Sequence, residues 1–220
     1  MRVLLEIGPK HKKLAAFAPD WPGFERGATT EEAAIARLRE YLPRYALVAS
    51  LAGLDAEFAR DPSIDVVDRY QGSGSTDFWG ISFASSEFDR EAVSTGTLAR
   101  ELALMQAAWA RIDSVRSSVS ADLQLGPRGG GRDRDLIARH VIGNEQDWAR
   151  KLGIPRIIDA SASAAALAAH REGYVSTIRA FHEQGKPARS WPLRYLIRHT
   201  AYHTLDHTWE MEDRDLTPSS

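Results

Sequence analysis

Residues 97–119 have the sequence TLARELALMQAAWARIDSVRSSV, and this stretch determines the architecture that we expect for most of the chain. Its large apolar side chains recur every three or four positions: Leu98, Leu102, Met105, Trp109 and Ile112. Residues at that spacing share one face of an α-helix, opposite a polar face. An apolar face of this length must be covered by other elements, so the stretch predicts a helical bundle.

Three further helices are expected after this one. The first spans about residues 133–152 and the second about residues 160–184, and each is followed by a glycine and a proline that end it. The last begins at the segment SWP, with Ser190 as its cap and Pro192 in its first turn. Four helices of about 20 residues, joined by mostly short links, favour a four-helix bundle over residues 92–214.

The glycine-rich segment GPRGGGR, residues 126–132, lies between the first two of these helices. A phosphate-binding P-loop would continue with a lysine and a hydroxyl residue, and this segment does not. We therefore interpret it as a connection between helices rather than as a nucleotide site.

The N-terminal part has a different pattern, which predicts strands. RVLLEIG at residues 2–8 and KLAAFAP at residues 13–19 are short apolar runs on either side of a basic turn, and they predict a β-hairpin. The segment DWPGFERG that follows is punctuated by proline and glycine, so we expect a loop there. SIDVVDRY at residues 63–70 alternates enough between apolar and polar side chains to predict a strand.

A helix is expected between the hairpin and the last strand. Thr29, with Glu32 three residues later, forms a capping-box pattern, and apolar residues follow at helical spacing as far as Ala52. Pro43 interrupts this pattern and should kink or break the helix. The expected fold class is therefore α+β: a small N-terminal unit of ββα(β) form followed by an all-α four-helix bundle.

These patterns divide the chain into four parts. Residues 1–75 form the α+β unit, residues 76–91 a linker, residues 92–214 the helical bundle and residues 215–220 a disordered tail. The linker is expected because GSGSTDFWGISF combines a flexible, polar start with only a short apolar run.

The composition limits the classes of function. Lysine and arginine total 28 against 30 aspartate and glutamate, a net charge of -2, so the chain lacks the positive field that holds nucleic acid nonspecifically. No apolar stretch approaches the roughly 20 residues of a membrane span, and the N-terminus lacks a signal-peptide pattern, so we expect a cytoplasmic protein. The absence of cysteine excludes disulfides, thiolate metal sites and a protein thiol nucleophile.

Three of the seven histidines lie four residues apart in HTAYHTLDH, residues 199–207. His199, His203 and His207 therefore share one helix face, either as a polar seam or as part of a metal site. The outer two are about 12 Å apart along the axis, so only an adjacent pair can hold one ion. A third ligand must come from elsewhere, and the candidate is His140, in the apolar setting of LIARHVIGNEQDW.

Several carboxylates and other histidines need an interpretation too. Glu145, Asp206 and Glu210 could orient the imidazoles by accepting their second N–H, or could be solvated surface charges. The remaining histidines are expected to be structural or solvent-facing: His11, His170 and His182. Without cysteine, any ion must be held by histidine, aspartate or glutamate, a set that suits zinc, nickel, iron or manganese.

Residues 92–214 resemble the DinB-like superfamily, which includes metal-dependent, thiol-linked transferases. The resemblance is carried by a histidine in the second helix, within RHVIGNEQDWARKLG, and by YHTLDHTWEMEDR in the last helix. It implies a divalent ion bound by His140, His203 and His207, since TWEME looks like the segment after the second histidine of the family's pair. His199 then lies outside the ligand set, where it lines the pocket or packs.

Residues 1–70 resemble HicB-type antitoxin domains through the segment LAAFAPDWPGFERGATTEEAAIARLREYL. The resemblance implies a strand, a loop and a helix, in a domain that binds a toxin partner. Such antitoxins often carry a separate DNA-binding segment, and here the helical bundle stands where that segment would follow. Trp21 and Phe24 in DWPGF are the first surface to consider for docking a partner, unless they pack the loop onto its own sheet.

Two hypotheses of different classes follow. The first is a divalent-metal-binding protein, with zinc, nickel or iron, that acts as a thiol transferase or hydrolase on a small-molecule substrate. Thiol transfer is implied by the resemblance, and it would need a low-molecular-weight thiol as cosubstrate because the chain has no cysteine. The second is a non-enzymatic binding or regulatory protein that docks a partner through its HicB-like domain. We expect neither membrane nor nucleic acid as a partner, and a homodimer is left open.

Overall fold

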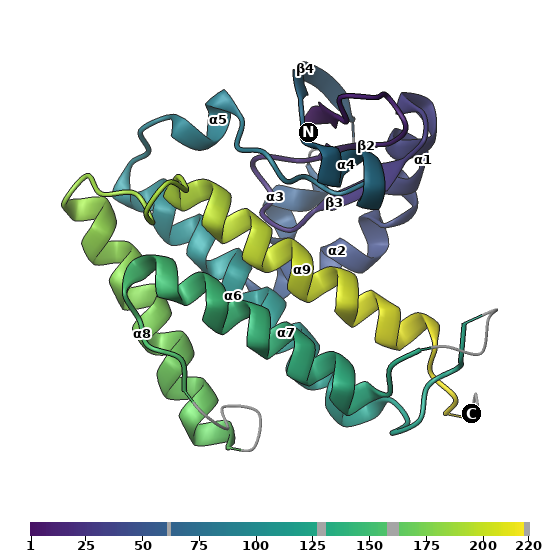
Figure 1. Ribbon diagram of the computed structural model, residues 1–220, viewed down its shortest axis with the longest axis vertical. Helices are drawn as coiled ribbons and strands as arrows, with labels where there is room; N and C mark the ends of the chain where they lie inside the picture. The colour runs from purple at the N-terminus through teal and green to yellow at the C-terminus, as the bar shows by residue number, and fades with distance from the viewer. Residues whose placement is uncertain (61–62, 127–130, 158–162, 218–220) are drawn as a thin grey trace.

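The structure is a computed structural model that describes residues 1–60, 63–126, 131–157 and 163–217 (Figure 1). Its fold class is α+β, as the sequence predicts: a four-stranded mixed sheet lies in the N-terminal part, and helices follow it. Among these described residues, none of the helices combines the length and the apolar character of a membrane span.

The sheet has the strand order β3-β2-β1-β4. Its strands are β1 (Arg2–Ile7), β2 (Leu14–Phe17), β3 (Glu25–Ala28) and β4 (Asp65–Gln71). β1 pairs with β2 in antiparallel orientation, which confirms the predicted hairpin, and with β4 in parallel. A parallel neighbour requires a long crossover connection, and the helices between β3 and β4 supply it.

The strand β3 lies in the segment DWPGFERG, for which the sequence predicts only a loop. Gly23 adopts a φ of 91°, a conformation that favours glycine, and it turns the chain back toward β2. β3 then pairs with β2 through the backbone, from Phe17 opposite Glu25 to Leu14 opposite Ala28. Its four residues, ERGA, include no β-branched or aromatic side chain, so their pattern carries no strand signal.

Three helices connect β3 to β4: α1 (Glu31–Glu40), α2 (Leu42–Leu51) and α3 (Asp55–Ala59). The predicted break is confirmed, because only Tyr41 separates α1 from α2 and Pro43 lies in the first turn of α2. The cap of α1 is Thr30, whose side chain accepts a hydrogen bond from the amide of Ala33, and not Thr29. In a capping box, the side chain of the third helical residue accepts a second hydrogen bond from the backbone amide of the cap residue. Ala33 has no side-chain acceptor, so α1 begins with a simple cap instead of the predicted capping box.

Four long helices form the C-terminal part: α6 (Thr95–Ser118), α7 (Arg134–Ala149), α8 (Ala164–Glu183) and α9 (Leu193–Asp213). A 3-10 turn, η1 (Arg150–Leu152), extends α7. α9 packs on both α6 and α7, and Figure 1 shows it crossing α6 with α8 to one side. The four helices that the sequence predicts are therefore present, at closely similar boundaries.

The start of α9 differs from the expectation. Pro192 is the cap residue, and no side chain caps the helix. Ser190, the predicted cap, lies in a tight turn that Ala188 and Trp191 close with two backbone hydrogen bonds. This turn takes Ser190 out of reach of the first helical amides, which corrects its predicted role.

One hydrophobic core runs from the sheet to the long helices. It includes Val3 of β1, Tyr45 of α2, Leu102 of α6 and Leu205 of α9, all without exposed surface. The core therefore does not divide at residues 76–91, where the sequence predicts a linker.

The segment 76–91 is itself folded. It includes most of α4 (Gly74–Trp79) and all of α5 (Glu87–Arg90), and each of these short helices begins with a serine capping box. Phe88 and Asp89 of α5 are buried. The segment is thus part of the packed structure, because its buried side chains anchor it where its polar composition suggested flexibility.

The predicted disordered tail begins with ordered residues. Asp215 forms a β-bridge with Leu123, and its carboxylate accepts hydrogen bonds from the amide and the hydroxyl of Ser120. These contacts hold the end of the chain against the connection between α6 and α7. Residues 218–220 lie outside the described residues, so for them disorder stays a prediction.

A buried ion network joins α9 to the N-terminal part. Arg198 is 4% exposed and donates to both carboxylate oxygens of Asp89, at 2.7 and 2.9 Å, and to the hydroxyl of Ser82 at 2.7 Å. The buried carboxylate of Glu25 lies 3.9 Å from the same guanidinium and accepts two hydrogen bonds from Ser82. Buried charges persist only when they are paired and hydrogen-bonded, so this network fixes α9 against the sheet.

Candidate metal centre

Two rows of side chains face each other between α7 and α9. Each row has residues four apart on one helix face: His140, Asn144 and Trp148 on α7, and His199, His203 and His207 on α9. The rows run antiparallel, because His140 lies against His207 at one end and Trp148 against His199 at the other, both with ring centroids 4.9 Å apart. Side chains far apart in the sequence are thereby brought into contact.

The three histidines predicted as ligands lie together at one end of these rows. The ring centroids of His140, His203 and His207 are 4.7 to 5.0 Å apart, and one donor nitrogen from each lies within 4.8 Å of the others. Nε2 of His140 is 3.2 Å from Nε2 of His203. Two nitrogens on one tetrahedral zinc ion are about 3.3 Å apart. The triad could therefore hold a metal ion.

The ring of His207 is oriented by a carboxylate. Its Nδ1 forms a hydrogen bond with Oε2 of Glu210 at 2.7 Å, and Glu210 also forms an ion pair with Arg214 at 2.8 Å. The hydrogen bond from His207 lowers the pKa of Glu210, so the carboxylate is ionised and Nδ1 of His207 carries the proton. Nε2 is then the atom free to bind an ion. Of the three carboxylates considered from the sequence, Glu210 is the one placed to orient a ligand.

The other two carboxylates have different partners. Asp206 accepts a hydrogen bond from Arg26 at 2.7 Å, and buried Glu145 pairs with Arg171 at 3.2 Å. A helix turns by about 100° per residue, so Asp206 points about 100° away from His207, and Glu145 about 140° away from His140. In the structure these two carboxylates pair with arginines, and within the described residues neither forms a hydrogen bond to an imidazole of the triad.

Burial keeps two imidazoles of the triad, those of His140 and His203, neutral. It lowers the pKa of His140 to about 4, with nearby His207 adding to the effect, and lowers the pKa of His203 well below its usual range. A neutral imidazole offers a lone pair to a metal, whereas an imidazolium does not. The rings of His140 and His203 are therefore ready to bind an ion at neutral pH.

His199, at the other end of its row, is not part of the triad. It is 5% exposed and lies among aromatic rings, with centroid distances of 4.9 to 5.9 Å: Phe83, Trp148, Trp191 and Tyr195. Its ring is stacked on that of Tyr195. Of the two roles open to His199 from the sequence, this environment favours packing.

His199 makes the stability of the fold sensitive to acid. Burial, assisted by Arg198, lowers its pKa to about 3, whereas an imidazole in the unfolded chain titrates near about 6.5. Its contribution is fully present above that pH and is lost as the pH falls, because the unfolded chain takes up a proton that the folded chain does not. By about pH 5 the loss should reach about 2 kcal/mol, measurable by urea unfolding.

The matched variant for this prediction is His199→Phe, which keeps a ring in the cluster and removes the titrating group. Its free energy of unfolding should depend less steeply on pH than that of the wild type over the same range. An identical dependence in the two proteins would contradict the role of His199.

The remaining histidines lie away from the triad, as expected. His11 is exposed, with a φ of 51°, and His182 is partly buried. His170 is buried in the helical part, with Nε2 3.6 Å from the carboxylate of Glu145. It is therefore structural.

Sequence reasoning missed the rest of the α7 row. Asn144 donates a hydrogen bond to the backbone carbonyl of His140 at 2.9 Å, and Trp148 contacts both His199 and His203. The signal was available, because both residues follow a candidate ligand at multiples of four on the same helix.

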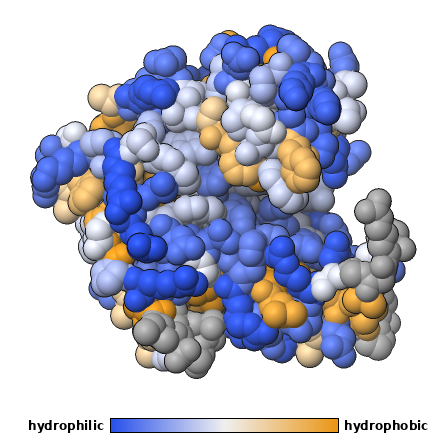
Figure 2. All heavy atoms as spheres, in the orientation of Figure 1, coloured by the Kyte–Doolittle hydropathy of each residue, from blue (hydrophilic) through white to orange (hydrophobic). Residues whose placement is uncertain are grey.

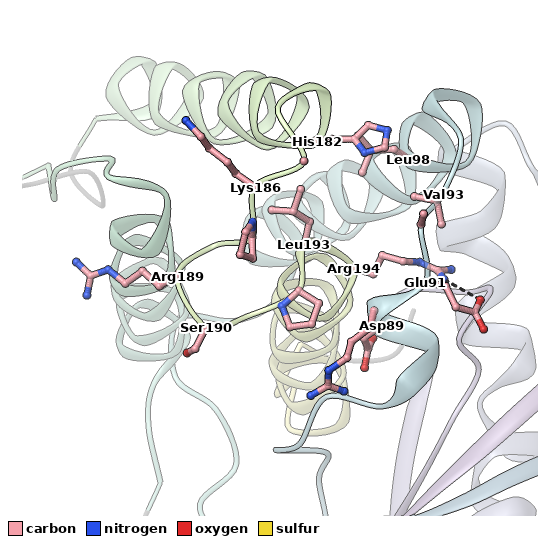
Figure 3. A pocket seen from close by; sticks show the side chains of 15 residues that line it. Asp89, Glu91, Val93, Leu98, His182, Lys186, Arg189, Ser190, Leu193 and Arg194 are labelled. Atoms are coloured by element: carbon pink, nitrogen blue, oxygen red, sulfur yellow. Dashed lines mark ion pairs between the residues drawn. The ribbon is translucent and has the colours of Figure 1, made fainter.

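A separate cavity of about 440 Å³ opens at the N-terminus of α9, beside α5 and the turn from α8 (Figure 3). Arg194 lies in it but is paired with Glu101 at 2.6 Å. Figure 3 shows Lys186 and Arg189 pointing away from Arg194, so the positive charges do not converge on one point. Nine residues of α9, or about 14 Å, separate Arg194 from His203, so this cavity is not part of the triad.

The triad is accessible from solvent. Its three histidines are only partly buried. Figure 2 shows a mostly hydrophilic face that is hollowed between the N-terminal part and α7, where α9 runs in Figure 1. The triad is therefore partly exposed and not sealed in the core.

Neither the family models nor the curated proteins nor the solved structures with which the chain was compared include a match. The chemistry of the triad is thus the basis for assigning a function.

Proposed function

We propose that this chain binds one divalent metal ion through His140, His203 and His207 and uses it in a reaction on a small molecule. The observation that carries the proposal is the meeting of three imidazole nitrogens, from two helices, within 4.8 Å. Imidazole ligands suit zinc, nickel or iron. Three protein ligands leave coordination positions open, as in catalytic sites rather than structural ones.

The reaction that we propose is thiol transfer, with hydrolysis as the alternative for the same ligands. A divalent ion in this centre would supply a Lewis acid that favours a thiolate or activates a water molecule. Because the three protein ligands are neutral, an anionic partner such as a thiolate is favoured at the open side. The thiol would be a low-molecular-weight cosubstrate, since the chain has no cysteine.

The placement of the ligands also supports the proposed relation to the DinB-like superfamily. One histidine comes from the second of the four long helices and a pair comes from the fourth, which is the pattern that the superfamily implies. The order of strands and helix in the N-terminal part is compatible with the proposed likeness to HicB-type domains.

A partner-docking role for the segment DWPGF has less support. Trp21 is 3% exposed and Phe24 is 1% exposed, and both rings pack against Phe58 of α3. These aromatics belong to the core, because the loop folds back over its own sheet and helices. Of the two alternatives that the sequence leaves open for Trp21 and Phe24, these contacts support packing.

Metal analysis of the untagged protein tests the proposal. We expect close to one zinc, nickel or iron ion per chain after purification without chelators. The cobalt(II)-loaded protein should gain a sulfur-to-cobalt charge-transfer band on addition of 2-mercaptoethanol, because a thiolate can enter a position that the imidazoles leave open.

The variant His199→Phe is the control, because its ring lies outside the triad, and it should load with metal as the wild type does. Bound cobalt that gives no charge-transfer band would favour hydrolysis over thiol transfer. A wild-type chain that takes up no divalent ion would overturn the metal centre itself.

A further inference from the structure

We propose that Trp148 positions His203 as a ligand: the face of its indole receives the Nδ1–H of that imidazole, which leaves Nε2 free to bind an ion. The inference rests on the proposed metal centre and adds to it a residue that coordinates nothing itself. Trp148 acts through His203, so it is a positioning residue.

The ring of His203 needs such a partner. Its Nε2 lies within hydrogen-bond distance, 3.2 Å, of Nε2 of His140 and so faces the triad. In the metal-free chain His140 is the donor of that hydrogen bond when His203 carries its proton on Nδ1. Nδ1 of His203 is buried and has no hydrogen-bond partner among the residues that the structure describes. A neutral imidazole carries one proton, and Nε2 can bind an ion only when that proton is on Nδ1.

His207 meets the same need with a carboxylate, because Glu210 accepts a hydrogen bond from its Nδ1 at 2.7 Å. In the described part of the chain, His203 has no such acceptor at Nδ1. An unpaired N–H in a buried position is unfavourable. Without another acceptor, the proton of His203 would move to Nε2, where it would block the ligand atom.

The indole of Trp148 lies against His203 from outside the triad. The two ring centroids are 5.1 Å apart and the ring planes meet at 81°, an edge-to-face arrangement. The other rings in contact with His203, within the described residues, are His140 and His207, which are themselves proposed ligands. The electron-rich face of an indole accepts an N–H weakly, so Trp148 can receive the proton of Nδ1.

Trp148 is itself held in place by a stack of rings. His199 lies 4.9 Å from it, and Tyr195 stacks on His199 at 5.3 Å with ring planes 20° apart. Trp191 lies at the edge of this stack, with its ring centroid 6.4 Å from that of Trp148, farther than His199. This arrangement gives His199 a role, because it supports the indole that orients the next histidine of its own row.

The tautomer of His203 tests the proposal without any metal. Nitrogen-15 NMR of the metal-free protein at about pH 8, where imidazoles are neutral, should show the proton on Nδ1 in the wild type and in Trp148→Phe. In Trp148→Leu, which lacks a π face, the proton should lie mainly on Nε2. Cobalt(II) affinity should fall roughly 10- to 100-fold in Trp148→Leu and stay within about threefold of the wild type in Trp148→Phe.

Trp191→Leu is the matched control, because it removes a partly buried indole of the same ring cluster that does not contact His203. It should keep the wild-type tautomer and cobalt affinity. The proposal is overturned if Trp148→Leu keeps both, or if Trp148→Phe binds cobalt as weakly as Trp148→Leu. A wild-type chain that binds no cobalt would overturn the metal centre instead, and the tautomer of the metal-free protein would still decide the role of Trp148.

Discussion

Replacing His203 with alanine is expected to weaken divalent-ion binding by on the order of 1,000-fold, which corresponds to about 4 kcal/mol of binding free energy. Its ring lies 5.0 Å from that of His140 and 4.7 Å from that of His207, measured between centroids. Without this ring, His140 on α7 and His207 on α9 remain as ligands, and both lose the ring that each of them contacts. Competition with a chelator of known affinity measures the change.

Two variants on the same helix face decide which pair of histidines binds the ion. His207→Ala should lose the ion as His203→Ala does. His199→Phe should retain it, because that ring packs among aromatics outside the triad. The opposite pattern, with the ion lost in His199→Phe and kept in His207→Ala, would move the centre one turn toward the N-terminus of α9.

Replacing Arg198 with methionine is expected to lower the free energy of unfolding by about 3–5 kcal/mol. The methionine would leave the carboxylates of Asp89 and Glu25 buried without their positive partner. Burial raises the pKa of Glu25 to about 7 even beside Arg198. Burial also acts to raise the pKa of Asp89, and Arg198 outweighs it and keeps that pKa below its ordinary value. Denaturant unfolding at neutral pH measures the loss.

The matched control for this prediction is Arg116→Met. Arg116 pairs with Asp135 at 3.0 Å, and both side chains are more than a third exposed, so its loss should cost less than about 1 kcal/mol. Adding Asp89→Asn to Arg198→Met should recover part of the stability, because it removes a buried unpaired charge. An equally small loss for Arg198→Met and Arg116→Met would contradict a structural role for the buried network.

The helices of this fold are predictable from the sequence because their apolar side chains recur at helical spacing. Residues 97–119 predict α6 in this way, and Pro43 predicts the break between α1 and α2. β3 is not predictable by the same means, because ERGA is held as a strand by backbone pairing with β2 and not by its side chains. The sequence also does not predict that the sheet and the long helices share one core. The spacing of apolar residues along a helix indicates that one face is buried, but it does not indicate which element covers that face.

The candidate site was predictable in part. The spacing of four places His203 and His207 on one face, but His140 lies 63 positions before His203, and only the packing of α7 on α9 brings them together. The apolar setting of His140 suggests it as the third ligand, and the proposed resemblance favours the pair His203 and His207 over His199 and His203. Glu210, and not Glu145 or Asp206, orients a ligand because of the direction in which each side chain points from its helix axis. Those directions decide the contacts only when α7 and α9 are packed together.

The unbroken core limits how this chain can evolve. Val3 and Tyr45 lie in the same core cluster as Leu102 and Leu205, so exchanging the first 75 residues for an unrelated domain would leave part of an apolar interior facing water. We therefore expect the sheet and the long helices to be inherited together. A volume change on α2 should select for compensating changes on α6, which packs against it, and lineages of this protein should show paired substitutions across that boundary.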